Sequence, residues 1–225
     1  MKLKKLFLIA FTLLLVTNLC AQDWRFGLKA SPTIAWLKTD TKGLEPDGSK
    51  LTFSWGFMAE YFFAENYAIS SGVEVGSYGG KLTTPNTSSI VNQNLRLKYI
   101  DVPIAVKMRT KEIGYMRYFG QFGFTPGFLI AAKADQDFTV PGFPKVSKED
   151  EDVKSDIIPI NVSLLIALGA EYSLSGNTAL VMSVSFNNGF IDIADFDILD
   201  PANNGSTKSA KMTAQAIRLN VGVLF

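Results

Sequence analysis

Apolar and polar side chains alternate over long stretches of this chain, with a period of two residues. The clearest stretch runs from Ile217 to Phe225, where apolar residues occupy the odd positions and polar or small residues fill most of the even ones. A period of two places the two sets on opposite faces of a β-strand. We therefore predict a final strand here, with Phe225 on its more apolar face.

Seven further segments alternate in the same way, which predicts an all-β fold of eight antiparallel strands. In the fourth segment Leu95, Leu97 and Tyr99 point to the apolar face, and the apolar positions then change phase at Ile100. Such a change predicts a β-bulge near 99–101, because a bulge re-aims the side chains that follow it. The predicted strands are 24–37, 51–63, 67–78, 95–109, 115–130, 157–172, 178–187 and a last one that begins near residue 210.

The connections between these segments alternate between short and long. Bacterial outer-membrane barrels have an even number of strands, short periplasmic turns and longer outer loops. The pattern therefore predicts an eight-stranded, antiparallel, up-and-down transmembrane β-barrel. Its short turns are 64–66, 110–114 and 173–177, and its four long polar outer loops are 38–50, 79–93, 131–156 and 188–209.

Aromatic residues gather toward the predicted strand ends, as in the interfacial girdles of outer-membrane barrels. A soluble barrel of the lipocalin type also alternates, but it would turn the apolar face inward. The girdles and the loop lengths favour a lipid-facing apolar surface. The predicted periplasmic girdle is Trp24, Phe26, Tyr61, Phe63, Tyr67, Tyr115, Tyr118, Tyr172 and Phe225, and the outer one is Trp36, Phe53, Trp55, Tyr99 and Phe128.

The first residues have the pattern of a secretory signal peptide. Lys2, Lys4 and Lys5 precede an apolar run over 6–16, which is too short for a membrane-spanning helix. Cleavage after Ala21 would leave 22–225 as the outer-membrane β-barrel domain. The only cysteine is Cys20, in this segment, so we expect no disulfides or thiol chemistry in the mature chain.

Composition narrows the possible chemistry. The formal charge is +1, and no block of like charge suggests binding to nucleic acid. The chain has no histidine, which excludes serine–histidine catalysis and histidine-ligated metals. We therefore expect a protein that is not an enzyme and that holds no metal and no other cofactor.

The phase of the alternation turns eight charged side chains into the barrel interior. Four are positive and four are negative, and a paired network is the simplest arrangement because an unpaired buried charge is costly. A narrow ion path or a substrate pocket is the functional alternative. The predicted lumen charges are Arg25, Lys29, Glu60, Glu74, Asp101, Lys107, Glu171 and Arg218.

One run of residues resembles a known family. The segment Leu97 to Lys107 contains Tyr99, Asp101 and Pro103, and it resembles the tyrosine–acid–proline–lysine strand of the Bacteroidetes outer-membrane β-barrel family, also labelled porin-family or PorT-like. The resemblance implies an eight-stranded barrel in the cell outer membrane, with Phe225 as part of the signal that the barrel assembly machinery reads. Further segments that fit are 26–30, 118–123 and 168–172.

These observations leave three hypotheses for function. The first is a structural or interaction barrel with a lumen filled by side chains, since eight strands leave an interior just wide enough to be filled. The second is a porin-like protein that conducts ions or small solutes. The third is an accessory factor for protein secretion, a role that some PorT-like proteins have. The expected partners are outer-membrane lipid, the assembly machinery and an unknown surface or secretion partner.

Overall fold

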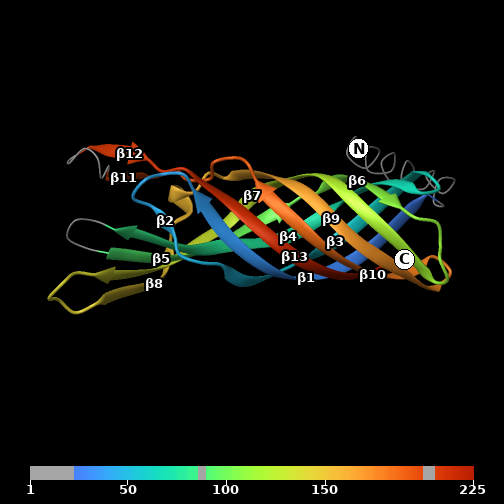
Figure 1. The fold of residues 1–225 in the computed structure, drawn as a ribbon, viewed down its shortest axis with the longest axis horizontal. Coiled ribbons are helices and arrows are strands. Elements are labelled where there is room, and N and C mark those ends of the chain that lie inside the picture. Colours follow the sequence, from blue (N-terminus) through green and yellow to red (C-terminus); the bar gives the residue numbers. More distant parts are fainter. Residues whose placement is uncertain (1–22, 86–89, 200–205) are drawn as a thin grey trace, which may run out of the picture.

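The computed structural model describes residues 23–85, 90–199 and 206–225, and the predicted signal peptide lies outside them. Long antiparallel strands wind around a closed barrel (Figure 1). The eight wall strands are β1 (Trp24–Thr39), β3 (Lys50–Ala64), β4 (Tyr67–Pro85), β5 (Ile90–Asp101) with its continuation β6 (Ile104–Arg109), β7 (Met116–Thr139), β9 (Ile160–Ser175), β10 (Thr178–Gly189) and β13 (Met212–Leu224).

The predicted fold class is confirmed. Each wall strand pairs with the next along the chain, and the ring closes where β1 pairs with β13, for example at Leu28 opposite Val223. Closure gives every wall strand a paired neighbour on both sides for at least part of its length, and this pairing satisfies backbone groups that lipid would leave without partners. Among the described residues, no helix is long and apolar enough to cross a membrane.

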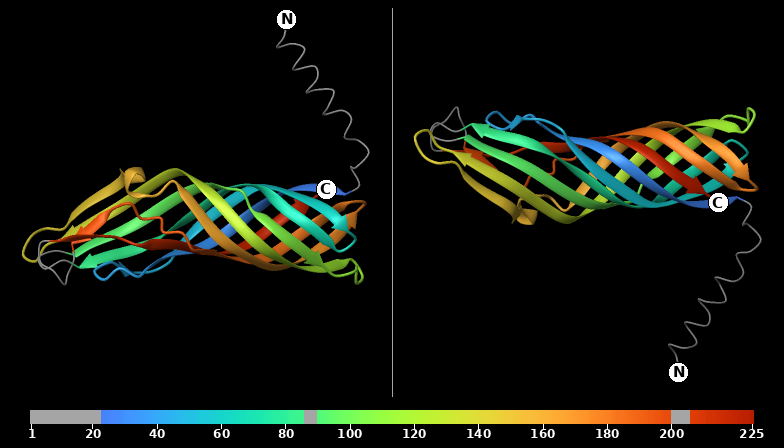
Figure 2. Two further views of the ribbon diagram at one scale, coloured as in Figure 1. Left: turned by 90° about the horizontal axis from the view of Figure 1, so that it is seen from above. Right: turned by 90° about the horizontal axis from the view of Figure 1, so that it is seen from below.

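The two ends of the barrel differ. At the end where the C-terminus lies, which we call the short-turn end, tight turns join the strands (Figure 2). At the opposite, long-loop end, the strands extend past the barrel as hairpins. The elements added at that end are β2 (Glu45–Pro46), β8 (Val146–Asp152), η2 (Lys154–Asp156), β11 (Asp197–Leu199) and β12 (Thr207–Ser209).

The expectation that 79–93 and 131–156 are loops is wrong for most of their length. β4 and β5 stay paired out to Pro85 opposite Ile90, and the outer part of β7 pairs with β8 from Phe138 to Lys133. β8 is exposed on both faces, and the outer parts of β4 and β5 mix buried Leu82 and Leu95 with polar residues, so regular alternation disappears from the sequence although the backbone pairing continues. The alternation of apolar and polar residues therefore marks the end of the apolar belt, whereas the strands continue beyond it.

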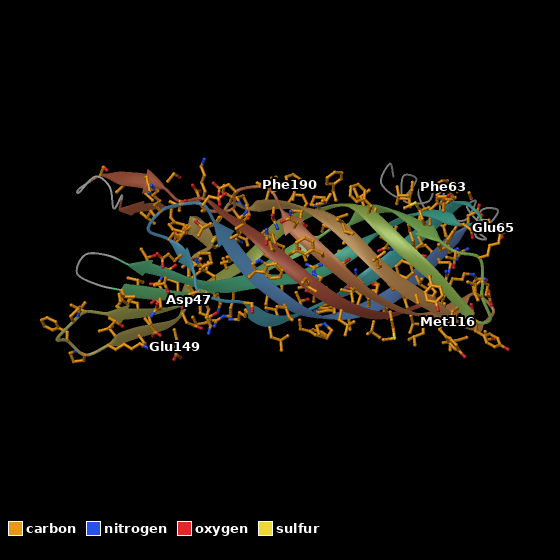
Figure 3. The ribbon with its side chains drawn as sticks, viewed as in Figure 1. Asp47, Phe63, Glu65, Met116, Glu149 and Phe190 are labelled. Carbon is orange, nitrogen blue, oxygen red and sulfur yellow. The ribbon has the colours of Figure 1, made fainter. Side chains whose placement is uncertain are left out.

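The outer face of the barrel is apolar. Phe57 is 61% exposed, and Leu28, Phe122 and Val184 are exposed on other strands. In the view of Figure 3, many side chains stand out from the upper and lower edges of the ribbon, and the labelled Phe63, near the short-turn end, and Phe190 lie along the upper edge. This is the orientation of a barrel that faces lipid, and it is the reverse of a soluble barrel.

The predicted bulge in the fourth strand is wrong, and so is the outward orientation of three residues. Leu95, Leu97 and Tyr99 are buried inside the barrel together with Asp101, so β5 alternates without a break. The lining of the barrel changes from apolar to polar at this level, and that change looks like a change of phase in the sequence. A register shift does occur opposite Lys98 and Tyr99, but the extra residue lies on β7.

An apolar core fills the long-loop end of the interior. Ile193, in the connection after β10, is fully buried there among wall residues such as Leu37 and Leu97. The backbone N–H of Ile193 donates to the carbonyl of Met212 on β13, and its carbonyl accepts from Ile158. This connection is therefore part of the packed interior and closes that end of the barrel.

Candidate functional site: two charge clusters in the lumen

All eight predicted lumen charges point inward, and they form two groups. The first, which we call the mouth cluster, lies toward the short-turn end and consists of Arg25, Glu60, Lys107 and Glu171. The Lys107 ammonium contacts Glu171 and lies 2.5 Å from Glu60 Oε1, and Arg25 Nη1 lies 2.8 Å from Glu171 Oε2. Lys107 Nζ also lies 4.1 Å from the centre of the Phe119 ring. The cluster contains two cations and two anions, so it is neutral overall.

The second group, the central cluster, lies deeper and consists of Lys29, Glu74, Asp101 and Arg218. Arg218 Nη2 donates to Asp101 Oδ2 at 2.9 Å, and its Nη1 donates to Glu74 Oε2 at 3.2 Å. Lys29 Nζ lies 2.5 Å from Glu74 Oε1. This cluster is also neutral, and it joins side chains from β1, β4, β5 and β13.

Glycines make room for the central cluster. A Cβ at Gly76 would clash with Asp101 Oδ2 and would come within 3.1 Å of Arg218 Nη2. The strand that carries Glu74 can therefore approach the buried carboxylate of its neighbour only if this position has no side chain.

A small cavity separates the two clusters. Its volume is about 40 Å³, and its lining includes Glu60 and Lys107 of the mouth cluster and Lys29, Glu74 and Arg218 of the central one. A water molecule needs roughly 10–15 Å³ of such space, so only a few could fit. Most of its lining residues are polar, and one of them is Glu60, whose Oε2 has no hydrogen-bond partner among the described residues.

Neutral polar groups fill the wall around this cavity. Asn220 accepts a hydrogen bond from the Ser31 hydroxyl at 2.8 Å and donates to Ser183 and Ser185 at 3.1 and 3.0 Å. The lining therefore satisfies most of its own polar groups, which is typical of a packed polar interior.

The mouth cluster opens into a vestibule at the short-turn end. This vestibule has a volume of about 500 Å³ and is lined by Arg25, Arg109 and Arg117, among others. Arg109 Cζ stacks 4.0 Å from the centre of the Phe62 ring, and its Nη1 lies 3.7 Å from Glu171 Oε2. The vestibule is wide, but it ends at the ion pairs of the mouth cluster.

Two residues that contact these clusters, Tyr78 and Arg109, are not among the predicted lumen charges. Tyr78 donates to Asp101 Oδ2 at 2.8 Å, and its ring lies 4.9 Å below the Arg218 guanidinium. Extending the alternation of the third strand by one step past Gly76 would have placed Tyr78 inside. Arg109 shares the inward phase of Lys107, and it is a further positive charge that contacts the four-residue mouth cluster at Glu171.

Phe225 differs from the lumen residues. Its side chain is 60% exposed, and its backbone exchanges two hydrogen bonds with Phe26 on β1, at 2.8 and 3.1 Å. The aromatic ring is therefore free on the outside of the barrel at the short-turn end.

A third set of charges joins the hairpins beyond the barrel. Arg96 on β5 forms a bidentate pair with Asp135 on β7 and a further pair with Asp150 on β8, at 2.7 Å. The Arg96 guanidinium holds the pKa of the Asp135 carboxyl below its usual range. The Lys133 ammonium, followed by Arg96, lowers the pKa of Asp150 in the same way.

No group of three or more His, Cys, Asp or Glu side chains in the described ranges 23–85, 90–199 and 206–225 could hold a metal ion. The carboxylates of the lumen are instead distributed between two sets of cations. Each acidic group of the clusters has a lysine or arginine within ion-pair distance.

Comparison with known proteins gives a family and a set of similar folds. Residues 20–195 match the family model of the outer membrane protein beta-barrel domain. No curated protein matches the sequence.

Among solved structures, Neisserial surface protein A has 13% identity and a TM-score of 0.45, over 88% of this chain and 95% of that one. OprG from Pseudomonas aeruginosa has 12% identity and a TM-score of 0.49, over 89% and 95%. Ail from Yersinia pestis, solved with the heparin analogue sucrose octasulfate, has 12% identity and a TM-score of 0.40, over 90% and 99%.

Proposed function

Because the chain belongs to the outer membrane protein beta-barrel domain family and lies in the outer membrane, we propose that it is a non-enzymatic barrel with a closed lumen. Its role in this proposal is structural or interactive, and it is performed at the surfaces of the barrel. The observation that carries the proposal is the pairing of all eight lumen charges into two neutral clusters, with a cavity of only about 40 Å³ between them.

Two barriers in series support a closed lumen. An ion that entered from the vestibule would have to displace the Lys107 pairs and then the Arg218 pairs. It would next meet the apolar core around Ile193 and Leu97, where leaving water is costly for any charge. A porin-like path needs a continuous polar lining, and the interior changes from polar to apolar along the barrel axis.

The extended hairpins support a role at the outer surface. Arg96 joins β5, β7 and β8, so the β7–β8 hairpin is held to the barrel by ion pairs as well as by backbone bonds. Phe143 is 73% exposed near the tip of this hairpin. A braced hairpin with an exposed aromatic residue suits contact with a partner in the medium.

Single-channel recording in planar bilayers tests the closed lumen. We expect the refolded wild-type barrel to insert without steady openings, as in a control addition of detergent alone. Steady openings whose size or ion selectivity changes in Lys107→Ala or Arg25→Ala would contradict the proposal, because the current would then pass the mouth cluster.

A further inference from the structure

The barrel wall has a seam between β3 and β4. Backbone pairing of these strands runs from the short-turn end only as far as Trp55 opposite Val75. Beyond this point side chains replace the ladder: Thr52 Oγ1 donates to the carbonyl of Ser77 at 3.0 Å, and the N–H of Ser77 donates to Ser54 Oγ at 3.0 Å. The outer part of β4 pairs with β2 instead, where Glu45 lies opposite Thr83.

Two glycines explain why β4 leaves β3. Gly79 has a φ of +155°, and a Cβ there would clash with the carbonyl oxygen of Leu95. A Cβ at Gly80 would lie 2.8 Å from the backbone nitrogen of Leu37 on β1. β4 therefore leans inward against β1 at this level, and the displacement opens a groove of about 430 Å³ beside β3, which we call the seam groove.

The seam groove has an apolar side and a basic side. Leu51, Phe53 and Trp55 of β3 line it, and all three are more than half exposed on the lipid-facing surface. Lys50 and Lys98 line the other part, together with the Arg96 guanidinium, and no carboxylate is part of the lining.

The two lysines of the groove form no ion pair among the described residues. Lys98 has no ion pair or hydrogen bond from its ammonium among the described residues, and Lys50 donates only to the neutral amide oxygen of Asn94, at 2.9 Å. Arg96 forms ion pairs with Asp135 and Asp150, and these pairs hold its side chain in place at the groove. Two lysines therefore remain available to an anion at the place where the apolar belt gives way to polar residues.

We infer that the seam groove binds one anionic lipid of the membrane. Its phosphate group lies between Lys50 and Lys98, and one acyl chain runs down along Phe53 and Trp55. Lysines close to a membrane surface attract anionic headgroups, and acyl chains occupy an apolar groove that faces lipid. A soluble anion would contact the two lysines only and would make no use of the apolar side of the groove.

Native mass spectrometry of the purified full barrel tests this inference, with phosphatidylglycerol and phosphatidylcholine as the probes. We expect the wild type to retain one phosphatidylglycerol and to prefer it to phosphatidylcholine. Each lysine near an anionic surface contributes about a fivefold gain in affinity, so Lys50→Gln with Lys98→Gln should weaken binding about 30-fold.

The matched control is Lys38→Gln with Lys211→Gln. It removes two exposed lysines that do not line the groove, and it should bind phosphatidylglycerol as the wild type does. Equal retention of the two lipids by the wild type, or unchanged binding in the Lys50 and Lys98 variant, would overturn the inference.

A second variant fills the groove and keeps both lysines. Ser77→Phe places a ring on its floor, whereas Val73→Phe adds the same ring lower on β4, outside the groove. We expect at least tenfold weaker binding of phosphatidylglycerol for Ser77→Phe and no change for Val73→Phe, with both variants folded by their heat-modifiable gel mobility. Unchanged binding in folded Ser77→Phe would overturn the inference, and neither result depends on whether the lumen conducts.

Discussion

Arg218 on β13 donates a 2.9 Å hydrogen bond to Asp101 on β5, a residue 117 positions away in the chain. The two strands lie on different parts of the wall, so the bond crosses the lumen. Both side chains are almost fully buried, and Arg218 also donates a hydrogen bond to Glu74. One guanidinium therefore compensates two carboxylates that have no access to bulk water.

Arg218→Met should destabilise the barrel strongly. It leaves Asp101 without a cation and Glu74 with Lys29 alone, and breaking a buried ion pair in this way costs about 3–5 kcal/mol. The free energy of unfolding in urea, measured in lipid vesicles, checks this. The control Lys145→Gln breaks an exposed pair with Asp137 and should leave the free energy of unfolding nearly unchanged. Equal stability of the two variants would contradict the role of Arg218.

Gly76→Ala should also be destabilising, although it adds a single methyl group. That methyl group would clash with Asp101 Oδ2 in an interior that has little room to relax, and overpacking of this kind costs about 1–3 kcal/mol. Gly120→Ala is the matched control, because its Cβ would meet its nearest atom, on Leu168, at 3.5 Å. The same unfolding assay in vesicles should distinguish the two variants. A loss in the free energy of unfolding for Gly120→Ala as large as that for Gly76→Ala would disprove the steric argument.

The β7–β8 hairpin should loosen in acid. The pKa of Asp135 is lowered by Arg96, and a carboxyl with a lowered folded-state pKa stabilises the fold above its unfolded-state pKa and loses this effect as the pH falls. We expect hydrogen-exchange protection of the hairpin, corrected for intrinsic rates, to be constant from neutral pH down to about pH 4 and to fall below it. In Asp135→Asn this step should be smaller, with the remainder due to Asp150, whose pKa is also lowered, and an unchanged step would refute the assignment.

Phe225→Ser should impair assembly more than stability. The substitution keeps the backbone bonds to Phe26 and removes only an exposed ring at the short-turn end. We expect slower insertion by the purified assembly machinery in proteoliposomes and an unchanged free energy of unfolding for the barrel once it is folded. Tyr115→Ser removes an aromatic side chain of similar exposure at the same end and should insert at the wild-type rate. Equal slowing in both variants would argue against a specific signal at Phe225.

The sequence predicts the membrane-facing part of the fold well, because lipid outside and charge inside impose a strict period of two. Arg25 and Glu60, for example, alternate with Phe26 and Tyr61 and could be placed inside from phase alone. The same rule fails for Leu95, Leu97 and Tyr99, since an apolar residue can face lipid or an apolar core, and periodicity does not distinguish the two. It also fails for β8, whose residues meet water on both faces.

The division of the lumen charges into two clusters could not be predicted either. It depends on strand tilt and register, which decide that Lys29 meets Glu74 while Lys107 meets Glu60. Strand membership alone allows several pairings among four cations and four anions.

The position of Arg218 on the closing strand has a consequence for the order of assembly. Glu74 and Asp101 belong to β4 and β5, and their shared cation arrives only when β13 takes its place between β10 and β1. Without β13, Asp101 has no cation within ion-pair distance among the described residues, and Glu74 has Lys29 alone. The charge of Asp101 is therefore compensated by the same strand that closes the ring, so the last strand supplies an electrostatic contact as well as the final backbone pairing.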